Sequence, residues 1–166
     1  MKKLKILLVL LFVASFSFAS DKIPARVLYV IDGDTIKVWL NGKKESVRLI
    51  GIDTPESKRN KRAKKQAKES SQTVEQIVAL GKKSKNFVKR IVHKGDIVYL
   101  ELDIQPRDRY GRILAYVWLK NGEMLNKKII CSGYAVPLTI PPDVKYAEKF
   151  RKCYRKARME RKGLWK

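Results

Sequence analysis

Hydrophobic and polar residues alternate through the first third of the chain in the manner of β-strands. Three stretches follow this pattern and are rich in β-branched and aromatic residues: 26–31, 35–40 and 46–50. Asp32-Gly33 separates the first two, and Asn41-Gly42 separates the second from the third. Because Asn-Gly between two alternating stretches is a strong hairpin signal, the pattern predicts a three-stranded meander.

The pattern changes after residue 56. Seven of the twelve residues from 57 to 68 are Lys or Arg, with no acid and no large apolar side chain. Such a stretch has no face to bury, so a mobile basic loop is predicted over 57–68. Apolar residues at helical spacing then predict helix in one or two pieces between residues 74 and 92, closed by Lys94-Gly95.

The rest of the pattern completes a small α+β domain. Strands are predicted over 97–102 and 113–119, and helices over 124–131 and 144–160. Five short strands, with helices inserted late and at the end, are typical of a five-stranded Greek-key barrel of the OB type with three helices. With no internal repeat, residues 20–166 are expected to form one domain.

The first 19 residues have the composition of a secretory signal peptide. Lysines within the first five positions precede an unbroken apolar run, and small residues follow around Ala19, where cleavage is expected. The run is shorter than the roughly 20 apolar residues that span a bilayer. We therefore expect a secreted or periplasmic protein with no stable membrane anchor after cleavage.

The charge of the chain indicates a polyanionic partner. Lys and Arg number 38 against 16 Asp and Glu, a formal net charge of +22. Removal of residues 1–19 takes away three lysines, which leaves 35 basic residues and a net charge of +19. The excess positive charge destabilises the folded chain by self-repulsion, and nucleic acid is a polyanion that would balance this charge. An anionic membrane or cell-wall polymer satisfies the same argument.

The two cysteines, Cys131 and Cys153, leave two readings open. An exported protein can join them in one disulfide. Two free buried thiols fit the spacing equally well, because spacing alone does not establish pairing.

The histidine count narrows the candidate chemistry. His93 is the single histidine, so mechanisms that need paired histidines, and zinc sites built on them, are excluded. Carboxylates and arginines remain, and they gather in three segments at predicted strand ends: 32–35, 53–56 and 108–112. Each segment alone is ordinary for a turn or a helix cap.

Together the three segments favour phosphodiester hydrolysis. Asp34 and Asp53, with a backbone oxygen nearby, form a hard oxygen set suited to Ca²⁺. Arginines bind phosphate oxygens through two parallel hydrogen bonds. Arg48 and Arg112 lie beside the carboxylates in the pattern. Glu56 supplies a further carboxylate that is able to orient and deprotonate a water.

The three segments resemble the conserved blocks of the staphylococcal nuclease (thermonuclease) family, in the same order. The blocks are Val30-Ile31-Asp32-Gly33-Asp34-Thr35, Arg48-Leu49-Ile50-Gly51-Ile52-Asp53-Thr54-Pro55-Glu56 and Asp108-Arg109-Tyr110-Gly111-Arg112-Ile113-Leu114-Ala115-Tyr116-Val117. The resemblance runs from about residue 24 to the C-terminus. It implies an OB-fold barrel with three helices and a Ca²⁺-dependent nuclease that acts on DNA and RNA to give 3′-phosphorylated products.

The resemblance also implies a role for each matching residue. Asp34 and Asp53 would bind Ca²⁺ through their side chains and Thr54 through its carbonyl. Glu56 would activate or position the attacking water. The other roles fall to basic and aromatic residues: Arg48 and Arg112 at the scissile phosphate, Arg109 and Tyr110 at another phosphate. It also places Cys131 and Cys153 on the last two helices, which pack together in this family.

The sequence departs from the family pattern at residues 137–142. Family members often carry stacking tyrosines there, whereas this stretch has no aromatic ring. The nuclease is expected to be a monomer. Two alternative functions are considered beside it. One is a catalytically silent OB module that only binds nucleic acid, and the other is a cationic protein directed to membranes or cell walls. Neither explains why every catalytic position carries the residue type that hydrolysis needs.

Overall fold

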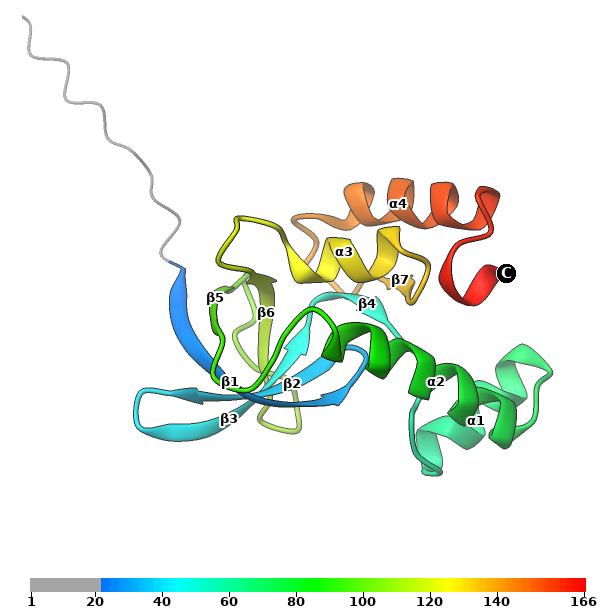
Figure 1. The fold of residues 1–166 in the computed structure, drawn as a ribbon, viewed down its shortest axis with the longest axis horizontal. Coiled ribbons are helices and arrows are strands. Elements are labelled where there is room, and N and C mark those ends of the chain that lie inside the picture. The colour runs from blue at the N-terminus through cyan, green and yellow to red at the C-terminus, as the bar shows by residue number, and fades with distance from the viewer. Residues whose placement is uncertain (1–21) are drawn as a thin grey trace, which may run out of the picture.

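Five strands close into a barrel in this computed structural model, which describes residues 22–166. The predicted signal peptide at 1–19 lies outside the described residues. In barrel order the strands are β1 (Ile23–Asp32), β2 (Thr35–Leu40), β3 (Lys43–Leu49), β6 (Ile113–Trp118) and β5 (Ile97–Glu101), as Figure 1 shows. Within this barrel the β3–β6 pair is parallel and the other strand pairs are antiparallel. The predicted α+β fold with a five-stranded OB-type barrel is therefore confirmed.

The strands close because their alternating residues share one interior. The inward residues are almost wholly buried: Val27, Ile36, Val38, Val47, Leu100 and Ala115. Asn41 and Gly42 both take positive φ, 48° and 76°, which is the turn that the Asn-Gly pair predicts between β2 and β3. Irregular register between β1 and β2 bends β1 toward its second partner, β5.

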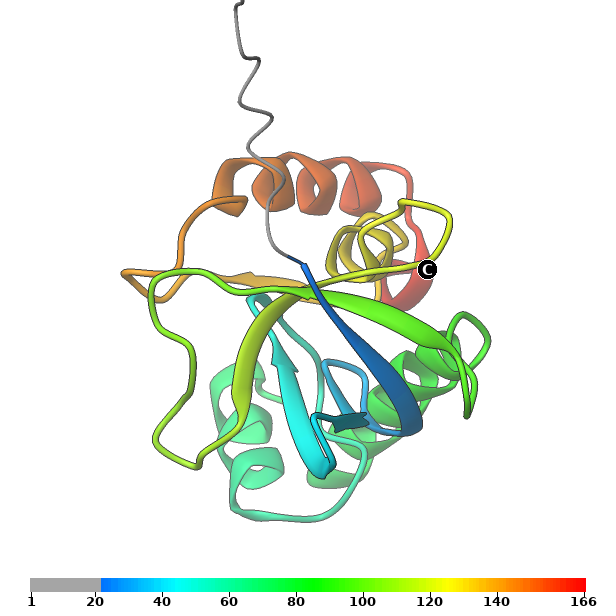
Figure 2. The ribbon, with the colours of Figure 1, turned by 90° about the vertical axis from the view of Figure 1, so that its left-hand side faces the viewer.

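Within residues 22–166 there are four helices rather than the predicted three, together with a short 3₁₀ turn. They are α1 (Lys61–Ser70), α2 (Val74–Lys89), α3 (Leu125–Cys131), α4 (Ala147–Met159) and η1 (Gly163–Trp165). Helices α3 and α4 lie side by side over one side of the barrel in both views, while α1 folds back against α2 (Figures 1 and 2). Among the described residues no helix is long and apolar enough to cross a membrane.

Residues 57–68 were predicted as a loop, and this is wrong from Lys61 onward. Helix α1 begins at Lys61 and is capped by Asn60, whose side chain accepts a hydrogen bond from the Ala63 amide at 2.7 Å. Ala63 and Ala67 are buried against Ile77 of α2. Two alanines form a sufficient buried face for this helix because α2 covers them.

Two smaller corrections concern other elements. Helix α2 ends at Lys89 rather than near Lys94, and the chain then turns so that Val92 enters the barrel core. A two-stranded sheet that the pattern did not predict joins β4 (Gly51–Asp53) to β7 (Val136–Leu138). This small sheet fixes the segment that leads into residues 53–56.

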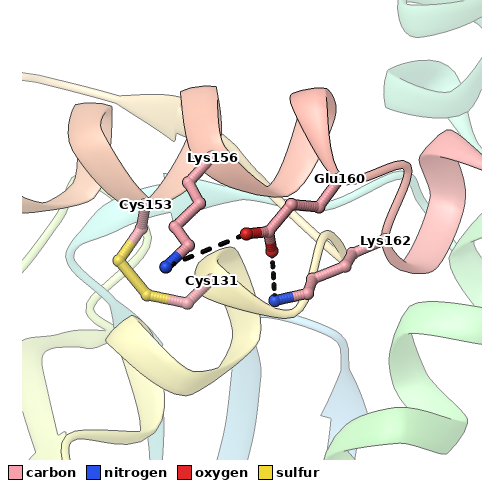
Figure 3. Close-up of a disulfide and its surroundings, with 5 residues drawn as sticks. All are labelled: Cys131, Cys153, Lys156, Glu160 and Lys162. Carbon is pink, nitrogen blue, oxygen red and sulfur yellow. Dashed lines mark ion pairs between the residues drawn. A yellow bond between two sulfur atoms is a disulfide. The ribbon is translucent and has the colours of Figure 1, made fainter.

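A disulfide joins α3 to α4 in the structure. Cys131 and Cys153 have their Cα atoms 4.5 Å apart, and Figure 3 shows the bond between the two helices. Glu160 lies nearby and pairs with Lys156 at 3.8 Å and with Lys162 at 2.5 Å. The C-terminal helix is therefore tied to the body by a covalent bond as well as by packing.

Candidate active site

Arg48 lies at the centre of a group of charged side chains at one end of the barrel. It stands on β3 opposite Thr35 of β2, and its side chain is only 10% exposed. Its Nη1 is 2.6 Å from Asp34 Oδ2, and its Nη2 is 2.8 Å from Asp53 Oδ1. One guanidinium thus brings together two carboxylates that lie far apart in the sequence.

Asp34 is held by four donors at the turn between β1 and β2. Beside Arg48, the Thr35 hydroxyl donates to its Oδ1 at 2.9 Å. The amide and the hydroxyl of Thr54 both donate to its Oδ2, at 3.0 and 3.1 Å. These donors come from β2, from β3 and from the segment after β4, so Asp34 fastens residues 53–56 to the barrel.

Glu56 follows on this locked segment and faces the same cavity. Burial raises the pKa of its carboxyl, and the nearby charges of Asp32 and Asp34 add to the rise. Its Oε2 accepts from Asn60 Nδ2 at 2.8 Å, and its Oε1 lies 3.0 Å from Arg62 Nε. A partly buried carboxylate with a raised pKa is a suitable proton acceptor for a water.

Asp32 supports this arrangement from the end of β1. Its carboxylate accepts from the Gly33 amide at 2.8 Å and from the Ser57 amide at 3.2 Å. Burial raises the pKa of Asp32, and the hydrogen bonds from Ser57 and Gly33 offset only part of that rise. Asp32 therefore fixes the chain just after Glu56, a role that the sequence did not reveal.

Arg112 reaches the site from the turn before β6. Its Nε donates to Asp108 Oδ2 at 2.7 Å, and its own amide donates to Asp108 Oδ1 at 3.0 Å. Burial of Asp108 opposes its charge, but the Arg112 hydrogen bonds outweigh burial and lower the pKa of the carboxyl. Asp108 is therefore charged and holds Arg112 in a fixed direction, with 32% of the arginine side chain exposed.

A cavity of about 450 Å³ brings most of these groups to one solvent space. The charged and aromatic side chains that line it are Asp32, Asp34, Arg48, Glu56, Arg62, Tyr110 and Arg112. Arg109 is not among them. Its guanidinium donates to the Tyr110 hydroxyl at 2.7 Å and lines a neighbouring cavity of about 420 Å³.

The donor atoms beside Arg48 suit a hard metal ion. In residues 22–166 no group of three or more His, Cys, Asp or Glu side chains gathers as a metal site. The candidate set is instead two carboxylates and one backbone carbonyl, from Asp34, Asp53 and Thr54. The two carboxylates already converge on one positive charge, and all three groups are oxygens of the kind that Ca²⁺ prefers. The residues present therefore fit such an ion.

Several residues that shape the site carry no signal of their own in the sequence. Gln66 of α1 donates to the Thr54 carbonyl at 3.0 Å and accepts from the Glu56 amide at 2.9 Å. Gly81 of α2 lies against the same segment, because a Cβ there would meet the Glu56 carbonyl oxygen at 2.3 Å. The Asn60 cap is the one signal that would have placed α1 beside the site.

Comparison with known proteins gives consistent matches. The family model for staphylococcal nuclease homologues matches residues 46–166. A thermonuclease of Staphylococcus hyicus is 37% identical over 140 residues, covering 84% of this chain and 74% of that protein. Endonuclease YncB of Bacillus subtilis is 35% identical over 137 residues, 81% of this chain and 58% of its own length. An uncharacterized protein of Methanocaldococcus jannaschii is 31% identical over 158 residues, covering 91% of this chain and 75% of that protein.

Proposed function

Because this chain belongs to the staphylococcal nuclease family and is a nuclease, we propose that it is a Ca²⁺-dependent enzyme that hydrolyses phosphodiesters of both DNA and RNA. The products would carry 3′-phosphates. The observation that supports this most is the convergence of Asp34 and Asp53 on Arg48. Asp34 and Arg48 line the same cavity as Glu56 and Arg112. Carboxylates, a base and two arginines thus meet at one place.

Glu56 is proposed to activate or position the water that attacks phosphorus. Its raised pKa makes it a stronger base than an exposed glutamate, and Asn60 directs its carboxylate. Proton transfer to such a group contributes about 10²–10⁴-fold to a rate. Because the segment that carries Glu56 is tied to Asp34 and Asp32, the base has little freedom to turn away.

Arg48 and Arg112 are proposed to bind the scissile phosphate and to stabilise the charge that grows on its oxygens. Guanidinium groups suit this because their planar forks match two phosphate oxygens at once. Arg112 is already directed into the cavity by Asp108. Removal of one such donor typically costs about 10²–10³-fold in turnover.

Ca²⁺ is proposed to be held by the carboxylates of Asp34 and Asp53 and by the carbonyl of Thr54. Nucleases of this family are metal-dependent, which supports a metal here. When bound, the ion would supply positive charge to the phosphate oxygens. The chain's own part is to hold these oxygens on two segments that the Asp34–Thr54 hydrogen bonds join.

Arg109 and Tyr110 are proposed to hold the substrate beyond the scissile phosphate. Tyr110 is 68% exposed and stands between the two cavities. The second cavity has Leu138 and Ile140 in its wall, within the stretch that lacks stacking tyrosines. Apolar contact would therefore replace stacking there, and stacking on an aromatic ring is worth about 1–3 kcal/mol per base.

We further propose that the protein acts outside the cytoplasm, as a monomer, once residues 1–19 are removed. The order of lysines, apolar residues and small residues before Ala19 supports export. The net charge of the mature chain supports a polyanionic substrate, since each lysine or arginine contact to a phosphate releases counterions.

A chelator-controlled nuclease assay tests the proposed function. The mature chain, residues 20–166, is incubated with fluorescent DNA and RNA in Ca²⁺ and then with excess chelator. We expect hydrolysis of both substrates in Ca²⁺ and none with chelator. Binding without hydrolysis by the folded protein, at any divalent ion concentration, would instead identify the silent OB module.

A further inference from the structure

Arg62 of helix α1 occupies the space between the carboxylates of Asp53 and Glu56. Its Nη2 is 2.5 Å from Asp53 Oδ1, and its Nε is 3.0 Å from Glu56 Oε1. The side chain is 49% exposed, whereas those of Asp53 and Glu56 are 16% and 18% exposed. A guanidinium that approaches from solvent thus covers two nearly buried carboxylates.

Helix α1 delivers Arg62 to this position with little freedom. The Asn60 side chain caps the helix and at the same time donates to Glu56, while Ala63 is fully buried against α2. Gln66, one turn after Arg62, bonds the Thr54 carbonyl. The helix is therefore fastened to the 53–56 segment on both sides of Arg62.

Asp53 Oδ1 consequently has two arginine partners, Arg48 and Arg62. The two contacts differ in setting. The Arg48 side chain is 10% exposed and also binds Asp34, whereas the Arg62 contact opens toward solvent. A divalent cation on the same oxygen would experience strong repulsion from both guanidinium groups, because unit charges about 4 Å apart interact by several kcal/mol near a protein surface. Arg62 is the partner that is able to leave.

We propose that Arg62 competes with the metal ion for these carboxylates and thereby sets the Ca²⁺ concentration at which the site fills. The inference rests on the proposed metal site at Asp34, Asp53 and Thr54. Binding of Ca²⁺ releases Arg62 from Asp53, and the arginine turns into the cavity that it already lines. The chain thus carries its own cation for the site, and a higher Ca²⁺ concentration is needed to fill it.

Calcium titration of the mature chain without nucleic acid tests this directly. Isothermal titration calorimetry compares wild type with Arg62→Met, which keeps an unbranched side chain and a similar helix propensity but removes the guanidinium and its charge. We expect the Kd for Ca²⁺ to fall about 10-fold, as the loss of two half-exposed ion pairs suggests. Arg62→Lys keeps one charge without the fork and should give an intermediate Kd.

Lys61→Met is the matched control, because it removes the same charge from the exposed neighbour on the same helix. Its Kd should stay within about twofold of wild type, since screened surface charges interact weakly. Thermal unfolding provides a second readout. The Ca²⁺-induced rise in Tm should be larger in Arg62→Met than in wild type or Lys61→Met, because tighter binding stabilises the folded state more.

An unchanged Kd in Arg62→Met overturns the proposal, as does an equal shift in Lys61→Met. The absence of binding heat in both wild type and Arg62→Met overturns it as well. None of these readouts involves nucleic acid. A wild-type protein that binds Ca²⁺ but does not cut DNA therefore refutes the proposed function while the competition is still measured.

Discussion

Replacement of both cysteines by serine should destabilise the protein by about 3 kcal/mol. Cys131 and Cys153 are 22 residues apart, and the chain-entropy relation for a closed loop of that length gives about 3 kcal/mol at 25 °C. Helices α3 and α4 also pack through buried side chains such as Ile129 and Phe150, so the folded structure should survive. For a domain of this size the loss corresponds to a fall in Tm of roughly 10 °C.

Thermal unfolding followed by circular dichroism, with and without a thiol reductant, measures this effect. Reductant should lower the Tm of wild type toward that of Cys131→Ser/Cys153→Ser and leave the double variant unchanged. Alkylation in denaturant provides the chemical control, because both thiols should react only after reduction. Equal Tm values with and without reductant, or free labelling of both cysteines in the unreduced chain, would refute the reasoning.

Three further predictions follow from the site and its surroundings. Glu56→Gln and Arg112→Ala should each lower kcat by at least about 10²-fold, measured as initial rates of folded protein; near-normal rates in both would place the site elsewhere. Replacing the four lysines of α1 by glutamine should reduce the slope of log binding constant against log salt by roughly two; an unchanged slope would mean a merely solvated face. Burial opposes the charge of Glu101, but hydrogen bonds from Lys145, Trp118 and Tyr146 outweigh burial and lower the pKa of the carboxyl. Wild type should therefore exceed Glu101→Gln in stability above about pH 4.5, the ordinary value, and lose that advantage as pH falls below it; a difference that persists in acid contradicts the pairing.

The barrel and its order of elements were predictable because the signals that specify them are local. Alternation identifies each strand, and Asn41-Gly42 identifies a turn, without knowledge of any distant contact. The three segments that carry the carboxylates and arginines could also be recognised in the sequence, because each lies at the end of a predicted strand. The convergence of Asp34 and Asp53 on Arg48 depends on the closed barrel. The positions of these residues at strand ends and the resemblance to a family predicted a shared site, but neither gave the contacts.

Helix α1 was missed for a physical reason. Its buried face consists of Ala63 and Ala67, and small side chains leave no strong apolar period in a lysine-rich stretch. The helix depends on the cap at Asn60 and on the neighbouring α2, and the second of these is a tertiary contact. The contacts of Arg62 with the site follow from that placement, so no local pattern predicts them.

The close approach of α2 to the catalytic segment has an evolutionary consequence. Gly81 carries no chemistry, yet a methyl group there would overlap the backbone of Pro55 and Glu56. A single substitution of alanine for this glycine could therefore abolish activity in a family member that kept every charged residue of the site. Surveys that sort family members into active and degenerate copies by their catalytic residues alone would misclassify such a descendant, and the residue at position 81 would identify it.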